Sequence, residues 1–308
     1  MFSIAIHGGA GTILRSSMTP EKEQAYKEAL QTALNIGYSI LEMGGTSLDA
    51  VEQAVRSLED CPLFNAGRGS VFTADGTHEM DASIMDGKTL NAGAVAGVHG
   101  VKNPVTLSRL IMEKSGHVML AAKGAVDFAK QMDCEFRDEE YFYDEFRFNQ
   151  WQEVKGSDTF QLDHAAKKDE KFGTVGAVAL DKAGNLAAAT STGGMTNKRF
   201  GRIGDSPVIG SGTYANNNTC AVSCTGSGEF FLRTVVAYDV SCLMEYKGLS
   251  LAEATKETVQ KRLLNIGGDG GLIAVDAKGN ISLEFNTEGM YRACKNSKGL
   301  EEISIYEA

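Results

Sequence analysis

The chain of 308 residues lacks the signals of several common protein classes. Proline occurs only 4 times and tryptophan once, and no apolar run is long enough to cross a membrane. No basic segment precedes an apolar one at the N-terminus, so no secretory signal is predicted. The six cysteines form no CxxC pair and no metal-finger spacing, which favours reduced thiols in a cytosolic protein.

Basic residues are also in short supply, with 30 Lys and Arg against 40 Asp and Glu. The resulting charge of −10 disfavours nucleic acid and anionic membranes as partners. Glycine is abundant instead, with 35 residues, which suits tight turns and close backbone approaches. A chain of this length can bury a large core, and we expect one compact unit.

A glycine–threonine pair separates two contrasting parts of the chain. Charged residues dominate up to Lys171, and a strand of small and β-branched residues is predicted from Val175 to Leu180. Cleavage between Gly173 and Thr174 would give the threonine a free α-amine with a pKa of about 7.7–8.0, able to accept the proton of its own hydroxyl. The junction alone is weak support for catalysis, because many strands begin with such a pair.

The first half alternates predicted helices and strands. Thr19 caps a helix from Pro20 to Ile40, and Ser47 caps a second that reaches Leu58. His7 opens a glycine run that we interpret as a tight loop near a site, with the histidine structural. Asp81 lies in an apolar strand, where a buried structural hydrogen bond is favoured over catalysis. Further strands are predicted at 4–6, 70–73, 79–85 and 92–98, and further helices at 103–115 and 124–132.

The second half contains a repeat. Residues 175–195 and 270–290 align without a gap and share eight identical positions, among them Asp181 with Asp276 and Gly184 with Gly279. Each copy predicts a hairpin with a short glycine-bearing loop. Between them, 229–246 is predicted to be helical, and Ser250 with Glu253 forms a capping box for another helix. Helices on either side of stacked antiparallel sheets are the simplest architecture.

Three glycine-rich polar stretches have the chemistry of a site. Residues 191–195 end the strand paired with 175–180, which would bring them beside Thr174. Residues 201–207 place Arg202 and Asp205 three positions apart, which also fits a surface salt bridge. Residues 223–229 lead a strand through glycines into a helix, a pattern suited to an oxyanion site.

The order of these motifs resembles the plant-type asparaginases, or isoaspartyl peptidases, of the N-terminal nucleophile hydrolase superfamily, and bacterial isoaspartyl peptidases most closely. The likeness covers nearly the whole chain. It implies an α+β fold, a four-layer αββα sandwich that forms one domain over 1–308. It also implies self-cleavage into 1–173 and 174–308, with a flexible linker at about 136–172. The matching stretches are HGGAG (7–11), FNAG (64–67), MDASIMDG (80–87), GTVGAVALD (173–181), ATSTGGMTNK (189–198), GRIGDSP (201–207), YANN (214–217), SCTGSGE (223–229) and FNTEGMYRA (285–293).

The resemblance also implies roles for single residues. Thr174 would be the nucleophile, oriented by Thr192, and Thr225 with the N–H of Gly226 would form the oxyanion hole. Arg202 would bind the substrate α-carboxylate and Asp205 its α-ammonium group. Gly226 and Gly228 would line the pocket, and Asn65 would lie near the nucleophile.

The resemblance predicts a structural sodium ion but no catalytic cofactor. The ion would be bound by main-chain carbonyls of the loop 58–68. Two cleaved pairs would associate as a dimer of heterodimers, in the cytoplasm, without nucleic acid or membrane. The carbonyl ligands would belong to Leu58, Glu59, Cys61, Phe64, Ala66 and Arg68.

The leading functional hypothesis is hydrolysis of β-aspartyl dipeptides and of L-asparagine to aspartate and ammonia. A glycosylasparaginase would use the same nucleophile and clamp but accept a sugar on the amide, and the sequence does not give the pocket width that separates the two. A non-enzymatic amino-acid- or nucleotide-binding protein could use the glycine loops without a cleavable junction.

Overall fold

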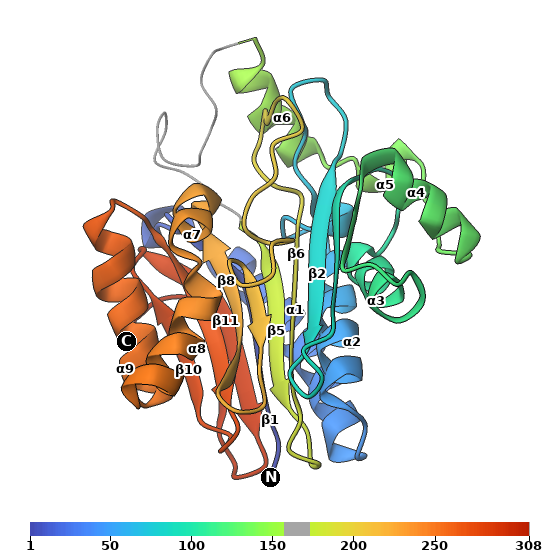
Figure 1. The fold of residues 1–308 in the computed structure, drawn as a ribbon. Helices are drawn as coiled ribbons and strands as arrows, with labels where there is room; N and C mark the ends of the chain where they lie inside the picture. Colours follow the sequence, from blue (N-terminus) through green and yellow to red (C-terminus); the bar gives the residue numbers. More distant parts are fainter. Residues whose placement is uncertain (157–172, 308) are drawn as a thin grey trace.

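The computed structural model describes residues 1–156 and 173–307, which form a mixed α/β fold with two antiparallel sheets (Figure 1). The larger sheet has the strand order β12-β11-β1-β5-β6-β2-β3-β4, of which only the β3–β4 pair is parallel. The smaller sheet has the order β10-β9-β8-β7. The strands are β1 (Ser3–Gly11), β2 (Met80–Asp86), β3 (Ala92–Val98), β4 (Met119–Ala121), β5 (Val175–Leu180), β6 (Leu186–Thr192), β7 (Thr213–Ala215), β8 (Cys220–Gly226), β9 (Gly270–Asp276), β10 (Ile281–Phe285), β11 (Gly289–Asn296) and β12 (Glu301–Ser304).

Alternating residues of the central strands bury both faces of the larger sheet. Ile4 and Ala177 pack with Leu34 and Val55 of the helices α1 and α2, whereas Val178 packs with residues of the smaller sheet. Helices α8 and α9 cover the other face of the smaller sheet (Figure 1). The helices are α1 (Pro20–Glu42), α2 (Ser47–Glu59), α3 (Pro104–Lys114), α4 (Ala122–Gln131), α5 (Glu139–Phe142), α6 (Glu145–Val154), α7 (Gly228–Thr234), α8 (Val236–Lys247) and α9 (Leu251–Glu257), with short 3-10 turns at Arg15–Ser17 and Gly67–Gly69 and a π-helical turn at Thr258–Leu263.

Side-chain caps fix several helix ends as the sequence predicts. The Thr19 hydroxyl accepts a hydrogen bond from the Lys22 N–H at the start of α1, and Ser250 and Glu253 form a complete capping box on α9. The second helix is capped by Thr46, one residue before the predicted Ser47. The predicted helix 229–246 is broken into α7 and α8 at Val235, whose φ of 51° is left-handed.

The predicted strand at 70–73 does not form. The N–H of Val71 donates to Oδ1 of Asn65, and the N–H of Thr73 donates to the carbonyl of Thr77. These donors serve the loop's own turns, so they are not available to a neighbouring strand.

The repeated hairpins have the same register in both sheets. Leu180 pairs with Leu186 in β5–β6, and the equivalent Val275 pairs with Ile281 in β9–β10. Oδ1 of Asp181 accepts the N–H groups of Ala183 and Asn185, and Oδ1 of Asp276 accepts those of Lys278 and Asn280. The aspartates therefore close the two turns in the same way.

The segment predicted as linker is ordered in its first part. Residues 136–156 contain α5 and α6, and Phe142, Arg147 and Trp151 are buried. The Trp151 ring stacks on Phe72, with centroids 5.6 Å apart. Burial of these aromatic side chains offsets the entropy cost of ordering the segment. The flexible linker that the resemblance implied at about 136–172 is therefore wrong for residues 136–156. The rest of the predicted linker, 157–172, lies outside the described residues.

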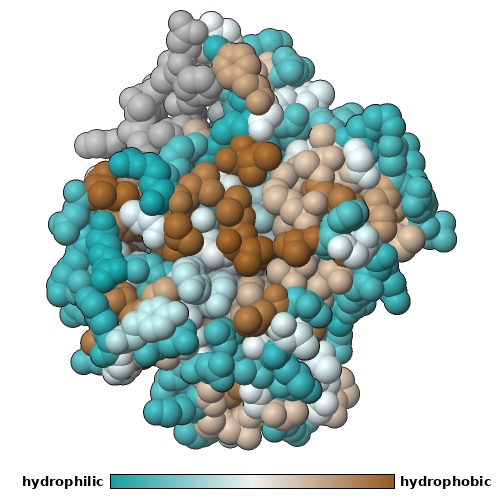
Figure 2. Space-filling view, viewed as in Figure 1, coloured by the Kyte–Doolittle hydropathy of each residue, from teal (hydrophilic) through white to brown (hydrophobic). Residues whose placement is uncertain are grey.

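The surface carries both apolar and hydrophilic regions. In the face shown in Figure 2, apolar residues gather across the middle and hydrophilic residues surround them. Within the described residues, no helix combines the length and apolar character needed to cross a membrane.

Candidate active site

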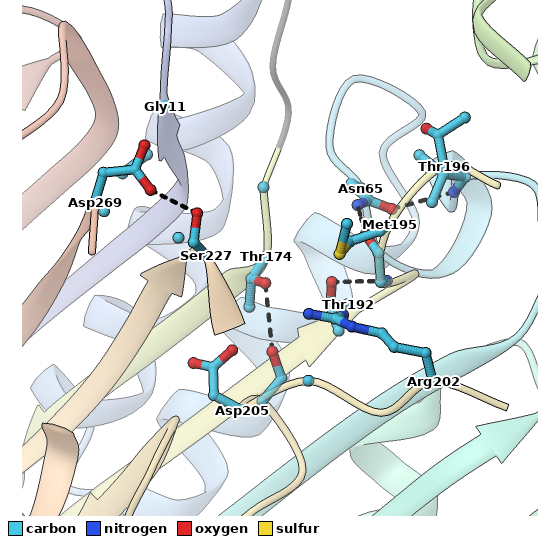
Figure 3. A pocket seen from close by; sticks show the side chains of 18 of the residues that line it. Gly11, Asn65, Thr174, Thr192, Met195, Thr196, Arg202, Asp205, Ser227 and Asp269 are labelled. Carbon is cyan, nitrogen blue, oxygen red and sulfur yellow. Dashed lines mark hydrogen bonds between the residues drawn. The ribbon is translucent and has the colours of Figure 1, made fainter. Parts of the chain in front are cut away.

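The ends of three strands from the two sheets meet at one pocket. Thr174 immediately precedes β5, Thr192 ends β6 and Gly226 ends β8, and all three line the pocket together with Asn65 and Asp205 (Figure 3). Thr174 is only 7 % exposed, although it lines the pocket. Tertiary packing thus brings together positions that span more than half of the sequence.

The Gly173–Thr174 junction lies against the backbone of β1. A Cβ placed on Gly9 would be 2.7 Å from the Gly173 nitrogen, and Gly9 has a φ of +115°. The register of β1 against β11 shifts between His7 and Gly9. The glycine run therefore lets the backbone pass close to the junction, as the sequence predicts.

The predicted oxyanion-hole residues lie beside this junction. The Thr225 hydroxyl accepts the N–H of Ala10 at 3.2 Å, and a Cβ on Gly173 would be 2.7 Å from the same oxygen. Gly226 has a φ of +148° and approaches the Asp269 carbonyl so closely that a Cβ would be 2.4 Å from it. Only glycine fits this position, at the end of β8 and before α7 begins.

Arg202 and Asp205 point into the pocket, but they are not paired with each other as the short spacing suggested. Arg202 forms a bidentate ion pair with Glu229, from Nε to Oε1 at 2.8 Å and from Nη2 to Oε2 at 2.9 Å. This pair leaves the Nη1 and Nη2 end of the guanidinium for a second carboxylate. Sequence reasoning missed Glu229, although it ends the matched motif SCTGSGE.

Asp205 is a buried carboxylate without full hydrogen bonding in the described part of the chain. It is 4 % exposed, and its Oδ2 has no hydrogen-bond partner there. Burial raises the pKa of Asp205 to about 7, although the nearby charge of Arg202 opposes this. A ligand ammonium group would supply the missing partner.

Gly228 does not line the pocket but lies behind Arg202 and Asp205. A Cβ on Gly228 would be 2.8 Å from Oδ1 of Asp205 and 3.0 Å from Nη2 of Arg202. The missing side chain therefore makes room for both charged groups, which differs from the expected lining role.

Asn65 and Thr192 shape the turn that follows β6. Nδ2 of Asn65 donates to the Gly194 carbonyl at 2.7 Å, and the Thr192 hydroxyl accepts the Gly194 N–H at 3.0 Å. Both residues line the same pocket as Thr174 (Figure 3).

A buried network of hydroxyl groups adds residues that sequence reasoning did not identify. Oγ of Ser206 lies 3.3 Å from Oγ1 of Thr174, and the Ser206 carbonyl accepts the Ser83 hydroxyl at 2.6 Å. Oγ of Ser83 also lies 2.8 Å from Oγ1 of Thr213, to which it donates a hydrogen bond. Ser83 and Ser206 lie in two separate matched stretches, 80–87 and 201–207, and Thr213 lies in neither. Their association therefore depends on the tertiary packing.

His7 and Asp81 are buried polar residues with hydrogen-bond partners inside the fold. Nε2 of His7 lies 2.9 Å from the Ser223 hydroxyl, and burial lowers the pKa of His7 to about 3. His7 is therefore neutral at ordinary pH. Oδ1 of Asp81 accepts the Gly97 N–H at 2.7 Å, and Asp81 is not among the pocket residues. Both observations agree with the structural interpretation.

The loop from Leu58 to Arg68 folds tightly around its own carbonyl groups. A Cβ on Gly67 would be 2.4 Å from the Glu59 carbonyl oxygen, and one on Gly69 would be 2.1 Å from that of Phe64. The carbonyls of Cys61, Phe64 and Ala66 each accept one loop N–H, which leaves a second lone pair on each of these oxygens, whereas the Leu58 carbonyl accepts two. Peptide oxygens suit hard cations, so the loop residues fit a sodium ion.

The chain is similar to known proteins along nearly its whole length. Residues 1–305 match the family described as asparaginase. An isoaspartyl peptidase of Escherichia coli (strain K12) is 56 % identical, covering 98 % of this chain and 95 % of its own. A probable isoaspartyl peptidase/L-asparaginase of Arabidopsis thaliana is 43 % identical over 99 % of both chains. A plant-type L-asparaginase of Thermococcus kodakarensis is 42 % identical, covering 94 % of this chain and 95 % of its own. The chain therefore belongs to the asparaginase family.

Proposed function

We propose that this protein is a threonine amidohydrolase that cleaves β-aspartyl dipeptides and hydrolyses L-asparagine. The observation that carries the proposal is the position of Thr174, whose hydroxyl shares one pocket with the Arg202 guanidinium and the unsatisfied Asp205 carboxylate. The names of the relatives, isoaspartyl peptidase and L-asparaginase, support the same substrate class.

The proposed substrate is held by its free amino acid end. The α-carboxylate binds the Nη1 and Nη2 end of Arg202, and the α-ammonium group binds Asp205. This orientation directs the β-carbonyl carbon toward Oγ1 of Thr174. Binding at two charged points fixes the reacting carbon beside the nucleophile and thereby lowers the entropic part of the barrier.

The proposed reaction has two chemical steps. The α-amine of Thr174 takes the hydroxyl proton, and Oγ1 attacks the β-carbonyl carbon. The Thr225 hydroxyl and the Gly226 N–H stabilise the oxyanion, and Thr192 orients the nucleophile. The C–N bond then breaks as the leaving nitrogen takes a proton from the α-ammonium group, which yields an acyl-enzyme. Water, deprotonated by the same amine, hydrolyses the ester and releases aspartate.

This chemistry requires an earlier self-cleavage of the Gly173–Thr174 bond, because an amide nitrogen cannot act as the base. The products would be fragments 1–173 and 174–308, which remain together in a four-layer αββα sandwich. We further propose a sodium ion in the loop 58–68, a cytoplasmic location and a dimer of the cleaved pairs. The apolar surface in Figure 2 supports self-association.

Intact-mass spectrometry of the purified protein tests the proposal. We expect fragments that begin at Met1 and Thr174, and activity on asparagine and a β-aspartyl dipeptide. Thr174→Ala should remain one chain and be inactive, whereas Thr174→Ser should still cleave. Cleavage of the alanine variant at this bond would refute the mechanism. A protein that prefers glycosylated asparagine would be a glycosylasparaginase, and one uncleaved chain that binds amino acids without hydrolysis would be a binding protein.

A further inference from the structure

The catalytic pocket has a wall that the proposed chemistry leaves without a role. This wall includes Arg147 and Gln150 of α6, which line the same pocket as Thr174. Arg147 is only 3 % exposed, and its Nη1 donates to Oε1 of Gln150 at 3.3 Å. A guanidinium carries five N–H donors in a planar fork, so in a ligand pocket it is suited to binding a carboxylate.

Helix α6 is held firmly in this position. Asp144 caps its N-terminus by accepting the Arg147 N–H at 3.0 Å. Trp151 stacks on Phe72, and Nδ2 of Asn197 donates to the Val154 carbonyl at 3.3 Å. These contacts fasten the helix to the loops that also supply Val71 and Thr196 to the pocket wall. Arg147 is therefore presented by a fixed element.

The geometry of the reacting carbon indicates what this wall meets, if the proposed function holds. The tetrahedral carbon bonds to Oγ1 of Thr174, to an oxyanion at Thr225 and Gly226, and to the amino acid end at Arg202 and Asp205. The fourth substituent is the leaving group. In the proposed pose it faces the side of the pocket that Asn65 and Thr196 line in Figure 3 and that α6 adjoins, opposite the side lined by Ser227 and Asp269.

We propose that Arg147, oriented by Gln150, is a specificity residue that binds the terminal α-carboxylate of the leaving amino acid. Arg147 and Arg202 are the two cations among the described residues that line the pocket. A β-aspartyl dipeptide carries two carboxylates, and Arg202 accounts for one of them. The ammonia released from asparagine has no carboxylate, so Arg147 favours dipeptides over asparagine.

The test compares two substrates that differ only at the proposed contact. These are β-aspartyl-leucine and the same dipeptide with its C-terminus amidated. We expect the wild-type protein to prefer the free acid in kcat/KM by roughly 10- to 100-fold, the range of a charge-assisted hydrogen bond. In Arg147→Gln the preference should fall to within about twofold. In Arg147→Lys it should be intermediate, because lysine lacks the planar fork.

Arg137→Gln is the matched control. This arginine is exposed, pairs with Glu135 and lies outside the pocket, so the variant should keep the wild-type preference. If Arg147→Gln fails to fold or to cleave itself, the lysine variant decides. The inference is overturned if every folded Arg147 variant keeps the wild-type ratio of kcat/KM for the free acid over the amide. It is also overturned if the wild-type protein hydrolyses the acid and the amide with equal kcat/KM.

The two proposals fail in different ways. A wild-type protein that hydrolyses neither asparagine nor the dipeptide refutes the proposed function itself. A wild-type protein that hydrolyses both, but has the same kcat/KM for the free-acid and the amidated dipeptide, refutes only the role of Arg147.

Discussion

Glu229 holds the guanidinium of Arg202 by two parallel hydrogen bonds of 2.8 and 2.9 Å. The pair fixes the plane of the guanidinium while its far end stays directed into the pocket (Figure 3). Glu229 is thus a positioning residue, since it acts on a ligand only through Arg202.

Glu229→Gln should raise KM for asparagine by roughly 3- to 10-fold, with a smaller change in kcat. The effect is modest because the Glu229 side chain is 45 % exposed and solvent screens the pair. Arg202→Lys should weaken binding further, since lysine lacks the bidentate fork, while self-cleavage continues. Steady-state kinetics and electrophoresis measure both effects. Unchanged kinetics in both variants would reduce Arg202 to a surface ion pair.

The pH dependence of activity should show an acid limb between about pH 7 and 8. Asp205 must be ionised to bind ammonium, and burial raises its pKa to about 7. The α-amine of Thr174 must be neutral, and such amines titrate at about 7.7–8.0. The pKa of His7 is lowered to about 3 by burial, so His7 cannot produce this limb. The limb of kcat/KM should therefore persist in His7→Gln. Its loss in a folded and cleaved variant would make His7 the base.

Asp205 should also destabilise the fold as pH rises. Its pKa is about 7 in the folded state and about 3.9 in an unfolded chain, so folding favours the protonated form. The contribution of Asp205 to the free energy of unfolding is most favourable below pH 4, where the carboxyl is protonated in both states. This contribution is lost as the pH rises to about 7. Asp205→Asn should therefore be more stable than the wild type at pH 8, by roughly 4 kcal/mol at most, and similar to it near pH 4. Denaturant unfolding at the two pH values measures the difference, and a difference that does not grow with pH would contradict it.

Gly9→Ala should impair self-cleavage. The added Cβ would lie 2.7 Å from the Gly173 nitrogen, and alanine is strained at a φ of +115°. We expect a loss of stability of about 1–3 kcal/mol and a slower appearance of the two fragments. Gly124→Ala is the control, because that glycine lies in α4 with nothing within 4 Å of an added Cβ. Equal cleavage rates in both variants would show that the backbone contact at Gly9 is unimportant.

Replacing sodium by choline at constant ionic strength should lower Tm, because an ion that binds only the folded loop stabilises it by mass action. Gly69→Ala should be less stable and should lose this sodium dependence. Its added Cβ would lie 2.1 Å from the Phe64 carbonyl oxygen, one of the proposed ligands. Thermal unfolding in both salts measures the effect. If the wild-type Tm is the same in sodium and in choline, a structural sodium ion is excluded under these conditions.

The local features of this protein could be predicted from the sequence alone. The Thr19 cap, the capping box at Ser250 and the two hairpins depend on residues within a few positions of each other. Thr174 at the start of a buried strand is local in the same sense, and the order of the glycine motifs was enough to indicate the family.

Contacts between distant residues depended on the tertiary structure. The partner of Arg202, the buried surroundings of Asp205 and the place of Arg147 in the pocket wall are set by how the sheets and α6 pack. The same packing ordered residues 136–156, although the resemblance implied a flexible linker at about 136–172. Sequence spacing placed Arg202 three residues from Asp205, yet the guanidinium pairs with Glu229, because a side chain interacts with what lies near it in space.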